Sequence, residues 1–401
     1  QYHQGPLSSI MFFLALMCYP KPAMVVLFQI IIATIVLGEI IYDFSVTYQK
    51  GKIGLFILIF SPASLYFAMY PIRAFLFAVF FLAFIHYYLK FCKKPNNKLL
   101  FQLTAVLCMI VNYRTEAKFL LLLYPFLLIK KCKSKRIIQM EIIVIASVFL
   151  ISALNVLGYQ RCNMSHKYLM LAAPLSMFLA DEVRDKTGLE QDLQNIDKVY
   201  DISYMQEHAH YSLAQKERLD TTYTKDDLNL FLKSSLKIIA NNPDLYLKAK
   251  ILCAMDSLGL RKSYSIKWRL PEEIKPQEIA VYFNDVDKET HDLFGQIVAG
   301  QYNYGSLSAY QIFYAFWLPC IMLFVIFAMG MKKELPLMFA SGVVIIQLLL
   351  TIFTAPGRYQ MYYYIEYLAG WYLVIYTYTK YGHWKTNRSK EKLLYCRNGE
   401  K

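Results

Sequence analysis

Long apolar runs alternate with short polar breaks along most of the chain. A helix needs about 17–25 largely apolar residues to cross a bilayer. Runs of that length occur at about 22–42, 53–70, 74–91, 137–158, 308–331, 335–353 and 358–380. Shorter runs lie at about 7–19, 99–113 and 116–129. The pattern predicts an all-α polytopic membrane protein with about nine or ten transmembrane or re-entrant helices.

One long polar stretch, residues 159–306, separates the first group of apolar runs from the last three. Within it, Thr224–Asp227 opens a stretch with helical apolar spacing, and Asn242-Pro243-Asp244 opens a second one. Such residues are typical of helix starts, so the two stretches predict a helical hairpin. Gln277–Asn284 alternates like a short strand. No flexible linker flanks the polar stretch, and we therefore expect it to pack on the membrane helices.

These boundaries divide the chain into four parts. They are N-terminal membrane helices (1–158), a mostly helical insertion (159–306), C-terminal membrane helices (307–381) and a basic tail (382–401). The run at 7–19 is short and ends before Pro20, so the pattern leaves open whether it spans the bilayer or lies along the interface. The chain begins with Gln1 and enters this run without the basic region of a signal peptide. We therefore expect at least one further helix before Gln1.

Composition and charge place most of this chain in a membrane. Hydrophobic residues make up 57% of its 401 residues and charged residues only 18%, and the mean hydropathy is +0.32. Soluble domains are less hydrophobic and more charged. The net charge of +14 comes largely from clusters beside apolar runs, namely Lys90–Lys98, Lys130–Arg136, Lys332-Lys333 and Lys380–Lys401. Basic clusters at helix ends mark the cytoplasmic side, so the charge predicts topology and no nucleic-acid partner.

Placing the basic clusters in the cytoplasm fixes the other loops by alternation. The insertion 159–306 then lies on the extracytoplasmic side of a cell membrane, and the tail 382–401 is cytoplasmic. Three further features fall on the same side as the insertion. They are Arg73, the break at 114–116 and Arg358.

No motif indicates a nucleotide, metal or cofactor site. The patterns GxGxxG, GxxxxGK[ST], GxSxG and HExxH are all absent from the sequence. The eight cysteines show no CxxC or Cys/His ligand spacing. His208 and His210 fit a solvated helix face better than a metal site. Cys162 and Cys253 share the insertion, where an oxidising compartment permits a disulfide between them without requiring one.

The most informative charges are Arg114 and Glu116, at the tip of a predicted hairpin between the runs at 99–113 and 116–129. They interrupt an otherwise apolar run, and ionisable groups at such positions are costly unless they pair or face a polar cavity. One interpretation is a structural ion pair at a tip that lies in water. The other is a reaction cavity, where the planar fork of Arg114 binds phosphate and Glu116 orients it or accepts a proton.

Other residues are predicted on the same face. Arg73 and Arg358 each begin a helix there, Tyr359 follows Arg358, and His3 lies in the opening segment. A single arginine at a helix end is usually an interfacial anchor, whereas three arginines from separated helices favour an anionic ligand. The tyrosine-rich run at 359–372 predicts an interfacial belt and packing, with a carbohydrate or isoprenoid contact surface as the alternative.

Short motifs are spread over most of the chain. They are HxxPL (3–7), Ser61-Pro62, YPIRAFLF (70–77), NYRTE (112–116), NNPDLYLK (241–248) and APGRY (355–359). Together they resemble the GT-C glycosyltransferases, membrane enzymes that use polyprenyl-phosphate-linked sugars. Members of that family generally carry a catalytic acidic residue in their first extracytoplasmic loop, and no such loop is visible here. In this resemblance, Arg73 holds the position where many relatives have an aspartate.

The resemblance implies transfer of a sugar from a polyprenyl-phosphate carrier to a glycan, lipid or protein acceptor at the outer membrane face, without a cofactor. Glu116 is the candidate catalytic residue, with a carboxylate before Gln1 as the alternative. The candidate substrate-binding residues are Arg114, Arg73, Arg358, Tyr359 and His3. Two other functions stay open: a polysaccharide polymerase or O-antigen-ligase-like enzyme, and a transporter or flippase for lipid-linked glycans. Transporters commonly contain internal repeats, and the sequence shows none.

The predicted topology can be tested by labelling introduced cysteines with a reagent that cannot cross the bilayer. We expect Ser212→Cys to react from the outside and Ser389→Cys only after the membrane is opened, because the lysine clusters fix the alternation. The exposed native cysteines are replaced first. Labelling of both positions from the same side would contradict the topology.

Overall fold

The computed structural model is all-α apart from one pairing of two-residue strands. It describes residues 6–48, 51–69, 73–157, 168–212, 223–260, 303–304, 307–308, 312–355, 357 and 360–398. Within these ranges the predicted all-α class is confirmed. The predicted strand at 277–284 lies outside the described residues.

Three groups of elements follow one another along the chain. The first contains α1 (Pro6–Cys18), α2 (Pro22–Thr47), α3 (Gly51–Ile59), α4 (Pro62–Met69), α5 (Arg73–Lys93), α6 (Asn97–Tyr113), the 3-10 turn η1 (Thr115–Lys118), α7 (Phe119–Leu128) and α8 (Ser134–Leu157). The insertion contains α9 (Leu169–Ala180), α10 (Glu190–Asp197), α11 (Ile202–Glu207), α12 (Lys225–Asn241) and α13 (Pro243–Ser257). The last group contains β1 (Asn303–Tyr304), β2 (Leu307–Ser308), α17 (Trp317–Lys333), α18 (Leu335–Thr354), the 3-10 turn η4 (Gln360–Tyr363) and α19 (Tyr364–Asn398).

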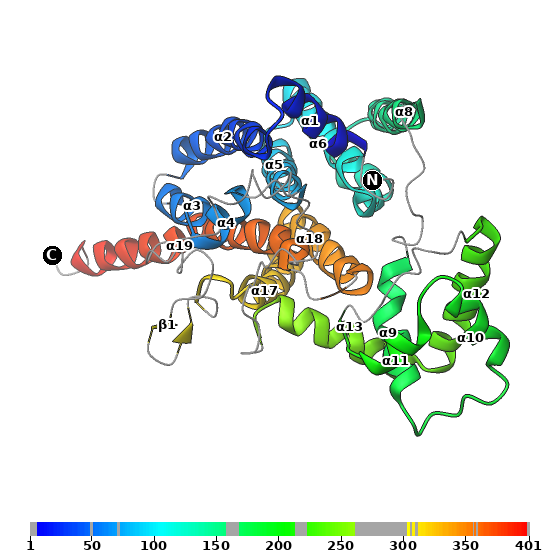
Figure 1. Cartoon of the computed structure of the whole chain (residues 1–401). Coiled ribbons are helices and arrows are strands. Elements are labelled where there is room, and N and C mark those ends of the chain that lie inside the picture. Colours follow the sequence, from blue (N-terminus) through cyan, green and yellow to red (C-terminus); the bar gives the residue numbers. More distant parts are fainter. Residues whose placement is uncertain are drawn as a thin grey trace.

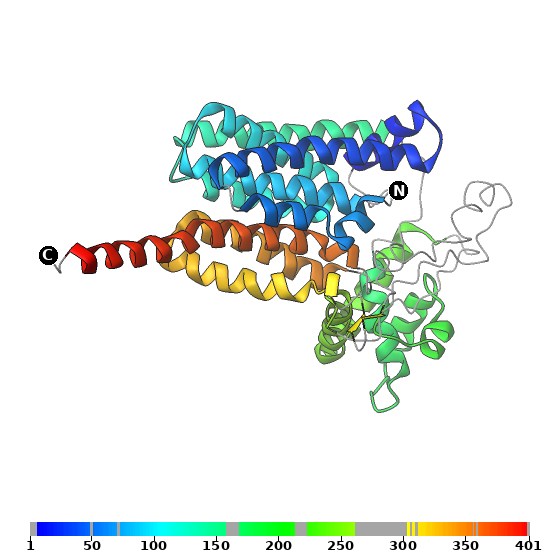
Figure 2. The ribbon, with the colours of Figure 1, turned by 90° about the vertical axis from the view of Figure 1, so that its left-hand side faces the viewer.

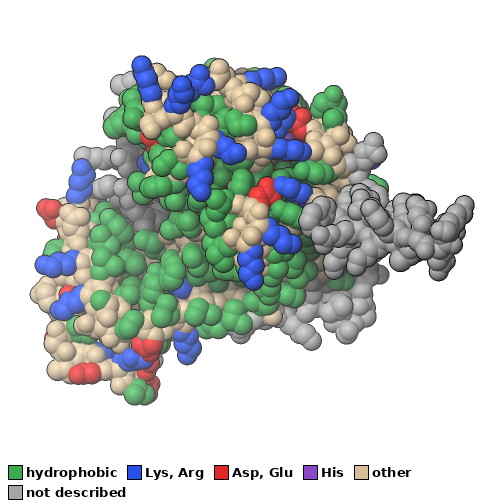
Figure 3. Space-filling view, turned by 180° about the vertical axis from the view of Figure 1, so that it is seen from behind, with side chains coloured by type: hydrophobic (Ala, Val, Ile, Leu, Met, Phe, Trp, Pro, Cys, Tyr) green, Lys and Arg blue, Asp and Glu red, His purple; other side chains and the backbone are tan. Residues whose placement is uncertain are grey.

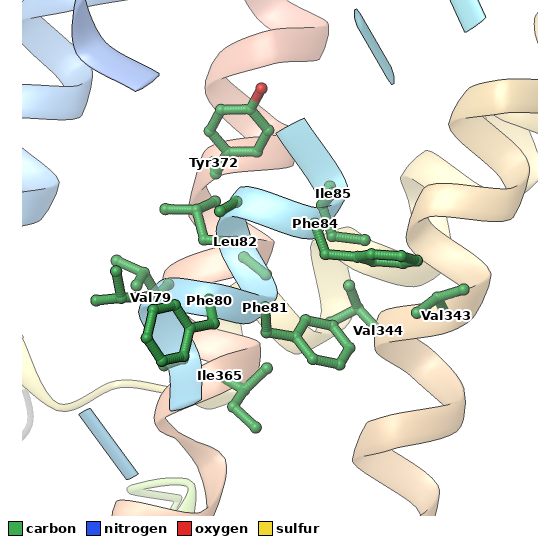
Figure 4. Close-up of a cluster of buried hydrophobic side chains, with 14 of the residues drawn as sticks. Val79, Phe80, Phe81, Leu82, Phe84, Ile85, Val343, Val344, Ile365 and Tyr372 are labelled. Carbon is green, nitrogen blue, oxygen red and sulfur yellow. The ribbon is translucent and has the colours of Figure 1, made fainter. Parts of the chain in front are cut away.

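The central helix of the bundle is α5 (Figure 1). Nearly all its side chains are buried, because it is apolar on every side and other helices surround it. Figure 4 shows side chains of α5, α18 and α19 in one hydrophobic cluster, with Phe81 of α5 next to Val344 of α18. Because α5 runs through the centre of the bundle, residues of the surrounding helices are positioned by their packing against it.

Four helices are long and apolar enough to cross a membrane, namely α2, α5, α8 and α18, counting only described residues. A fifth span results if α3 and α4, which meet at a bend of 47°, count as one. The expected number of about nine or ten also included the three shorter runs, which form α1 with 13 residues, α6 with 17 and α7 with 10. It also included the long runs at 308–331 and 358–380. The first of these forms α17, which begins only at Trp317 and has 17 residues, and the second forms the tyrosine-rich start of α19.

Several predicted breaks fall at the expected residues. The helix break at Ser61-Pro62 separates α3 from α4, and the Ser61 hydroxyl accepts a hydrogen bond from the backbone N–H of Ser64 at 3.3 Å. The hairpin at 99–129 is confirmed as α6, η1 and α7. In the insertion, Thr224 caps α12 in a reciprocal capping box with Asp227, and α13 begins at Pro243. The local capping rules therefore predict these starts well.

The insertion packs at one end of the bundle, as expected (Figure 2). It has a hydrophobic core of its own, which includes Leu175, Tyr200 and Phe231. The last of its described helices, α13, also joins the bundle. The backbone N–H of Trp317 donates to the Leu258 carbonyl at 3.1 Å, and the side chain of Leu258 belongs to the core of the bundle.

The opposite end of the bundle is basic. Figure 3 looks onto this end and shows Lys and Arg side chains gathered there. The exposed basic residues at the helix ends here are Lys93, Lys94, Lys98, Lys130, Lys131, Lys133, Lys135, Arg136, Lys332 and Lys333. The basic clusters that the sequence placed on one side of a membrane therefore share one end of the bundle, away from the insertion.

A close backbone contact between α17 and α18, at Gly330, allows a test of this packing. A Cβ at Gly330 would lie 2.4 Å from the backbone nitrogen of Met338, so Gly330→Ala must push the two helices apart. We expect it to lower the free energy of unfolding by about 1–3 kcal/mol. A Cβ at Gly38, on the exposed face of α2, meets nothing within 4 Å, and Gly38→Ala is the matched control. Equal unfolding energies for the two variants would contradict the close helix contact.

Candidate functional site

Arg114 lies where α6 ends and η1 begins, at the end of the bundle nearest the insertion. Its backbone is extended, with φ −140° and ψ 138°, and this turns the chain out of the helix. Although it is charged, the residue is only 7% exposed. The Arg114 guanidinium donates to Glu116 through Nη2 at 2.8 Å and through Nε at 3.3 Å. The predicted pair is thus a two-bond ion pair of the kind that fixes the guanidinium plane.

Two aromatic rings hold the same guanidinium from neighbouring elements. Its central carbon lies 5.1 Å from the ring centre of Phe77 on α5 and 4.9 Å from that of Tyr362 in η4. Cation–π contacts are strongest where water is excluded, as around this buried group. Arg114 is therefore fixed by contacts to three separate parts of the chain.

A second arginine lies beside this group. Arg73 is the first residue of α5 and is partly exposed. Its charge interacts with those of Arg114 and Glu116. Within the described part of the chain, no hydrogen bond or ion pair satisfies the Arg73 guanidinium. Two cations thus lie beside the Glu116 carboxylate, which is already ion-paired with Arg114, and the unpaired Arg73 favours an additional anion.

The charge state of Glu116 follows from its surroundings. Burial raises the pKa of its carboxyl group, whereas the charge and hydrogen bonds of Arg114 lower it. Together with the other contacts, the effect of Arg114 is the larger one, so the net pKa lies below its usual value. Glu116 is therefore ionised at neutral pH. A general base works best with a pKa near the operating pH, so this environment suits an orienting group better than a base.

The structure thus brings Arg73, Arg114 and Glu116 together, as the sequence predicted. The other three predicted site residues, His3, Arg358 and Tyr359, lie outside the described residues. The described neighbours of Arg358 and Tyr359 are Gly357 and Gln360, and both are buried.

A lysine of the insertion contacts the start of the APGRY motif. Lys250 of α13 is 3% exposed, and its Nζ donates to the Ala355 carbonyl at 2.9 Å. The Tyr246 hydroxyl donates to the nearby carbonyl of Phe353 at 3.3 Å. Two side chains of α13 therefore hold the end of α18, directly before residues that the sequence assigned to the site.

Four side chains of the tyrosine-rich run point into the bundle. Tyr363, Tyr364, Tyr367 and Tyr372 are all buried. The ring centre of Tyr364 lies 4.6 Å from that of Phe67. These four tyrosines therefore pack inside the bundle, as one of the predictions for this run stated, and do not form an aromatic belt at the surface.

Sequence inspection missed a buried acid, Glu366, in the first turn of α19. Its exposed fraction is 0%, and neither carboxylate oxygen has a hydrogen-bond partner within the described part of the chain. The rule that singled out Arg114, an ionisable residue inside an apolar run, also applies to Glu366 and would have found it.

A second missed cluster lies toward the basic end of the bundle, where a recess is lined by residues of α2, α5 and α19. His86 contacts the Tyr372 hydroxyl through Nδ1 at 2.9 Å and Asp43 through Nε2 at 3.3 Å. Lys90 also donates to Asp43. Chains of ionisable residues inside a membrane protein can mark a proton pathway, and this cluster has that composition.

No group of three or more His, Cys, Asp or Glu side chains forms a metal site among the described residues. Cys162, one partner of the disulfide considered above, lies outside the described residues. The Cys253 thiol lies 2.7 Å from the Tyr211 carbonyl. The site as described therefore consists of charged and aromatic side chains.

Comparisons with protein-family models, with curated proteins and with solved structures give no match to this chain.

The contact between the insertion and α18 predicts a pH dependence. Burial lowers the pKa of Lys250 to about 8 from 10.5. Between those values the unfolded chain binds a proton that the folded chain does not, so the Lys250 contribution to stability rises with pH from about 8 to about 10.5. Lys250→Met should remove this dependence. We expect the free energy of unfolding of the native protein to gain about 2–3 kcal/mol relative to the variant over that window. A constant difference would contradict the buried, neutral amine.

Proposed function

We propose that the protein transfers a sugar from a polyprenyl-phosphate carrier to a glycan, lipid or protein acceptor at the outer face of a cell membrane. One observation supports the proposal most: Arg73 and Arg114 converge at one end of the bundle, Arg114 is ion-paired with Glu116, and Arg73 has no hydrogen bond or ion pair among the described residues. A phosphate at the end of a lipid chain carries the charge that this arrangement lacks.

The chemistry of such a transfer fits arginine. The bond between the sugar and the phosphate breaks through an oxocarbenium-like state, and negative charge grows on the departing phosphate. Guanidinium groups stabilise that charge with paired N–H donors, which match phosphate oxygens better than a lysine point charge does. Because Glu116, Phe77 and Tyr362 already fix Arg114, little reorganisation is needed when the phosphate leaves.

Within this proposal, Glu116 orients Arg114. Its lowered pKa makes it a weak base at neutral pH, while its two hydrogen bonds set the plane of the guanidinium. The base that takes the acceptor proton is then another carboxylate. The insertion lies at the same end of the bundle as the arginines, and in the proposed topology it would face the acceptor on the outside (Figure 2).

A second candidate function is transport of a lipid-linked glycan. The observation that favours it is the Asp43–His86–Tyr372 chain inside the bundle, because proton relays of ionisable residues are typical of membrane transporters. Both candidates use the same arginines for phosphate. They differ in whether the sugar leaves its carrier.

The test of the proposed function is sugar transfer from a labelled polyprenyl-phosphate donor by purified, folded variants. Arg114→Lys should lower turnover by about 10²–10³-fold, since a point charge replaces an oriented fork. Arg73→Ala should also lower it, whereas Glu116→Gln should cost less than either. Lys118→Ala is the matched control, because Lys118 is an exposed cation on the same tip.

Two outcomes would contradict the proposal. Parental turnover in folded Arg114→Lys would leave the Arg114–Glu116 contact as a structural ion pair. Movement of the intact carrier across the bilayer, with no sugar transferred under any condition, would favour the transporter.

A further inference from the structure

Glu366 occupies an unusual environment for an acid. It is the third residue of α19 and lies on the bundle side of the helix start, with an exposed fraction of 0%. An isolated ionised carboxylate without water or hydrogen-bond donors is strongly disfavoured. The group must therefore either find a cation or carry a proton.

The groups around Glu366 come from four different elements. Thr351 of α18 and the guanidinium of Arg114 both interact with its carboxyl group. Cys320 of α17 and Tyr363 of η4 also feel its charge. Of these neighbours, only Arg114 is charged at neutral pH, and its hydrogen bonds go to Glu116.

Thr351, an uncharged neighbour of Glu366, also contacts a second buried polar side chain. On α18, Gln347 donates through Nε2 to the Thr351 hydroxyl at 3.2 Å. The other amide atom, Gln347 Oε1, is buried and has no donor among the described residues, like both oxygens of Glu366. A proton on Glu366 would remove the buried charge.

We propose that Glu366 is a proton-binding site inside the bundle, and that its protonation is coupled to anion binding at Arg114. The first half stands on the burial and missing partners of Glu366. The second half rests on the proposed phosphate site.

The coupling follows from electrostatics. When Glu366 is ionised, its negative charge partly compensates Arg114 and weakens the attraction of Arg114 for an incoming anion. When Glu366 is protonated, that competition disappears. By linkage, an anion at Arg114 must in turn favour the protonated form of Glu366. Anion binding is then accompanied by proton uptake.

The proton site is tested by infrared spectroscopy of the full chain in detergent. A protonated carboxyl group gives a C=O stretching band that a carboxylate lacks. The difference spectrum between native protein and Glu366→Gln should contain this band at neutral pH, and the band should disappear as pH rises. Glu141→Gln, which changes another acid with a buried unpartnered oxygen, is the matched control and should keep the Glu366 band.

Each contrary result has a clear meaning. Absence of the band at every pH would show that Glu366 is ionised and would overturn the proton site. Loss of the band on adding sodium at constant pH would replace the proton with an alkali cation. Glutamine has the shape of a protonated glutamic acid, so failure of Glu366→Gln to fold would also contradict the proposal.

The coupling is tested with farnesyl phosphate as the probe and farnesol as its neutral counterpart. Across the pH range in which the Glu366 band appears, the affinity of the native protein for farnesyl phosphate should rise about tenfold as pH falls, and that for farnesol should not change. In Glu366→Gln the affinity should be independent of pH over this range. An equal pH dependence in both proteins would overturn the coupling.

Failure of the proposed function would look different. If native protein bound farnesyl phosphate no better than farnesol, the phosphate site and the coupling would both be wrong. The infrared band would still decide whether Glu366 holds a proton.

Discussion

A charge inside a lipid-embedded bundle has no water to solvate it, so it must find a partner within the protein or be neutralised. Most ionisable residues of this bundle meet that requirement in pairs. Lys90 and His86 contact Asp43, and Lys380 donates to Glu334 at 2.6 Å, which ties α19 to the loop between α17 and α18. Arg73 and Glu366, which form no ion pair within the described part of the chain, both lie near Arg114. Two ionisable groups without an ion pair therefore lie at the end of the bundle that carries the insertion.

The arrangement of helices explains how this concentration is possible. Because α5 is enclosed by other helices, its first residue, Arg73, is brought next to the tip of the α6–α7 hairpin. The turn η4 and the start of α19 reach the same place from the far end of the sequence and supply Tyr362 and Glu366, respectively. The contacts of α13 with the end of α18 then place the insertion beside these residues. Rigid helices therefore position the charged groups, which is what a site for an anionic ligand requires.

The Arg114–Glu116 contact illustrates why a single ion pair is weak evidence of function. A buried pair can be structural, and its own stability contribution is often small. The additional cation beside it changes the interpretation, because Arg73 adds a charge that the pair cannot neutralise. In the same way, the lowered pKa of Glu116 changes its expected role from base to orienting group. The roles of these side chains are set by their neighbours more than by their residue types.

The class of protein, several helix starts and the shared end of Arg73, Arg114 and Glu116 could be predicted from the amino-acid sequence alone. Apolar runs, the Ser61-Pro62 break and the Thr224 cap are local features that act over one or two helical turns, so they can be recognised without knowing the fold. The positions of Arg73, Arg114 and Glu116 at one end followed from helix alternation. Only the tertiary structure decided that α5 is central, that four tyrosines of the run at 359–372 pack inward, and that Glu366 is buried without a partner. These properties depend on which helix faces pack together, and that is decided by contacts between residues hundreds of positions apart, such as His86 and Tyr372.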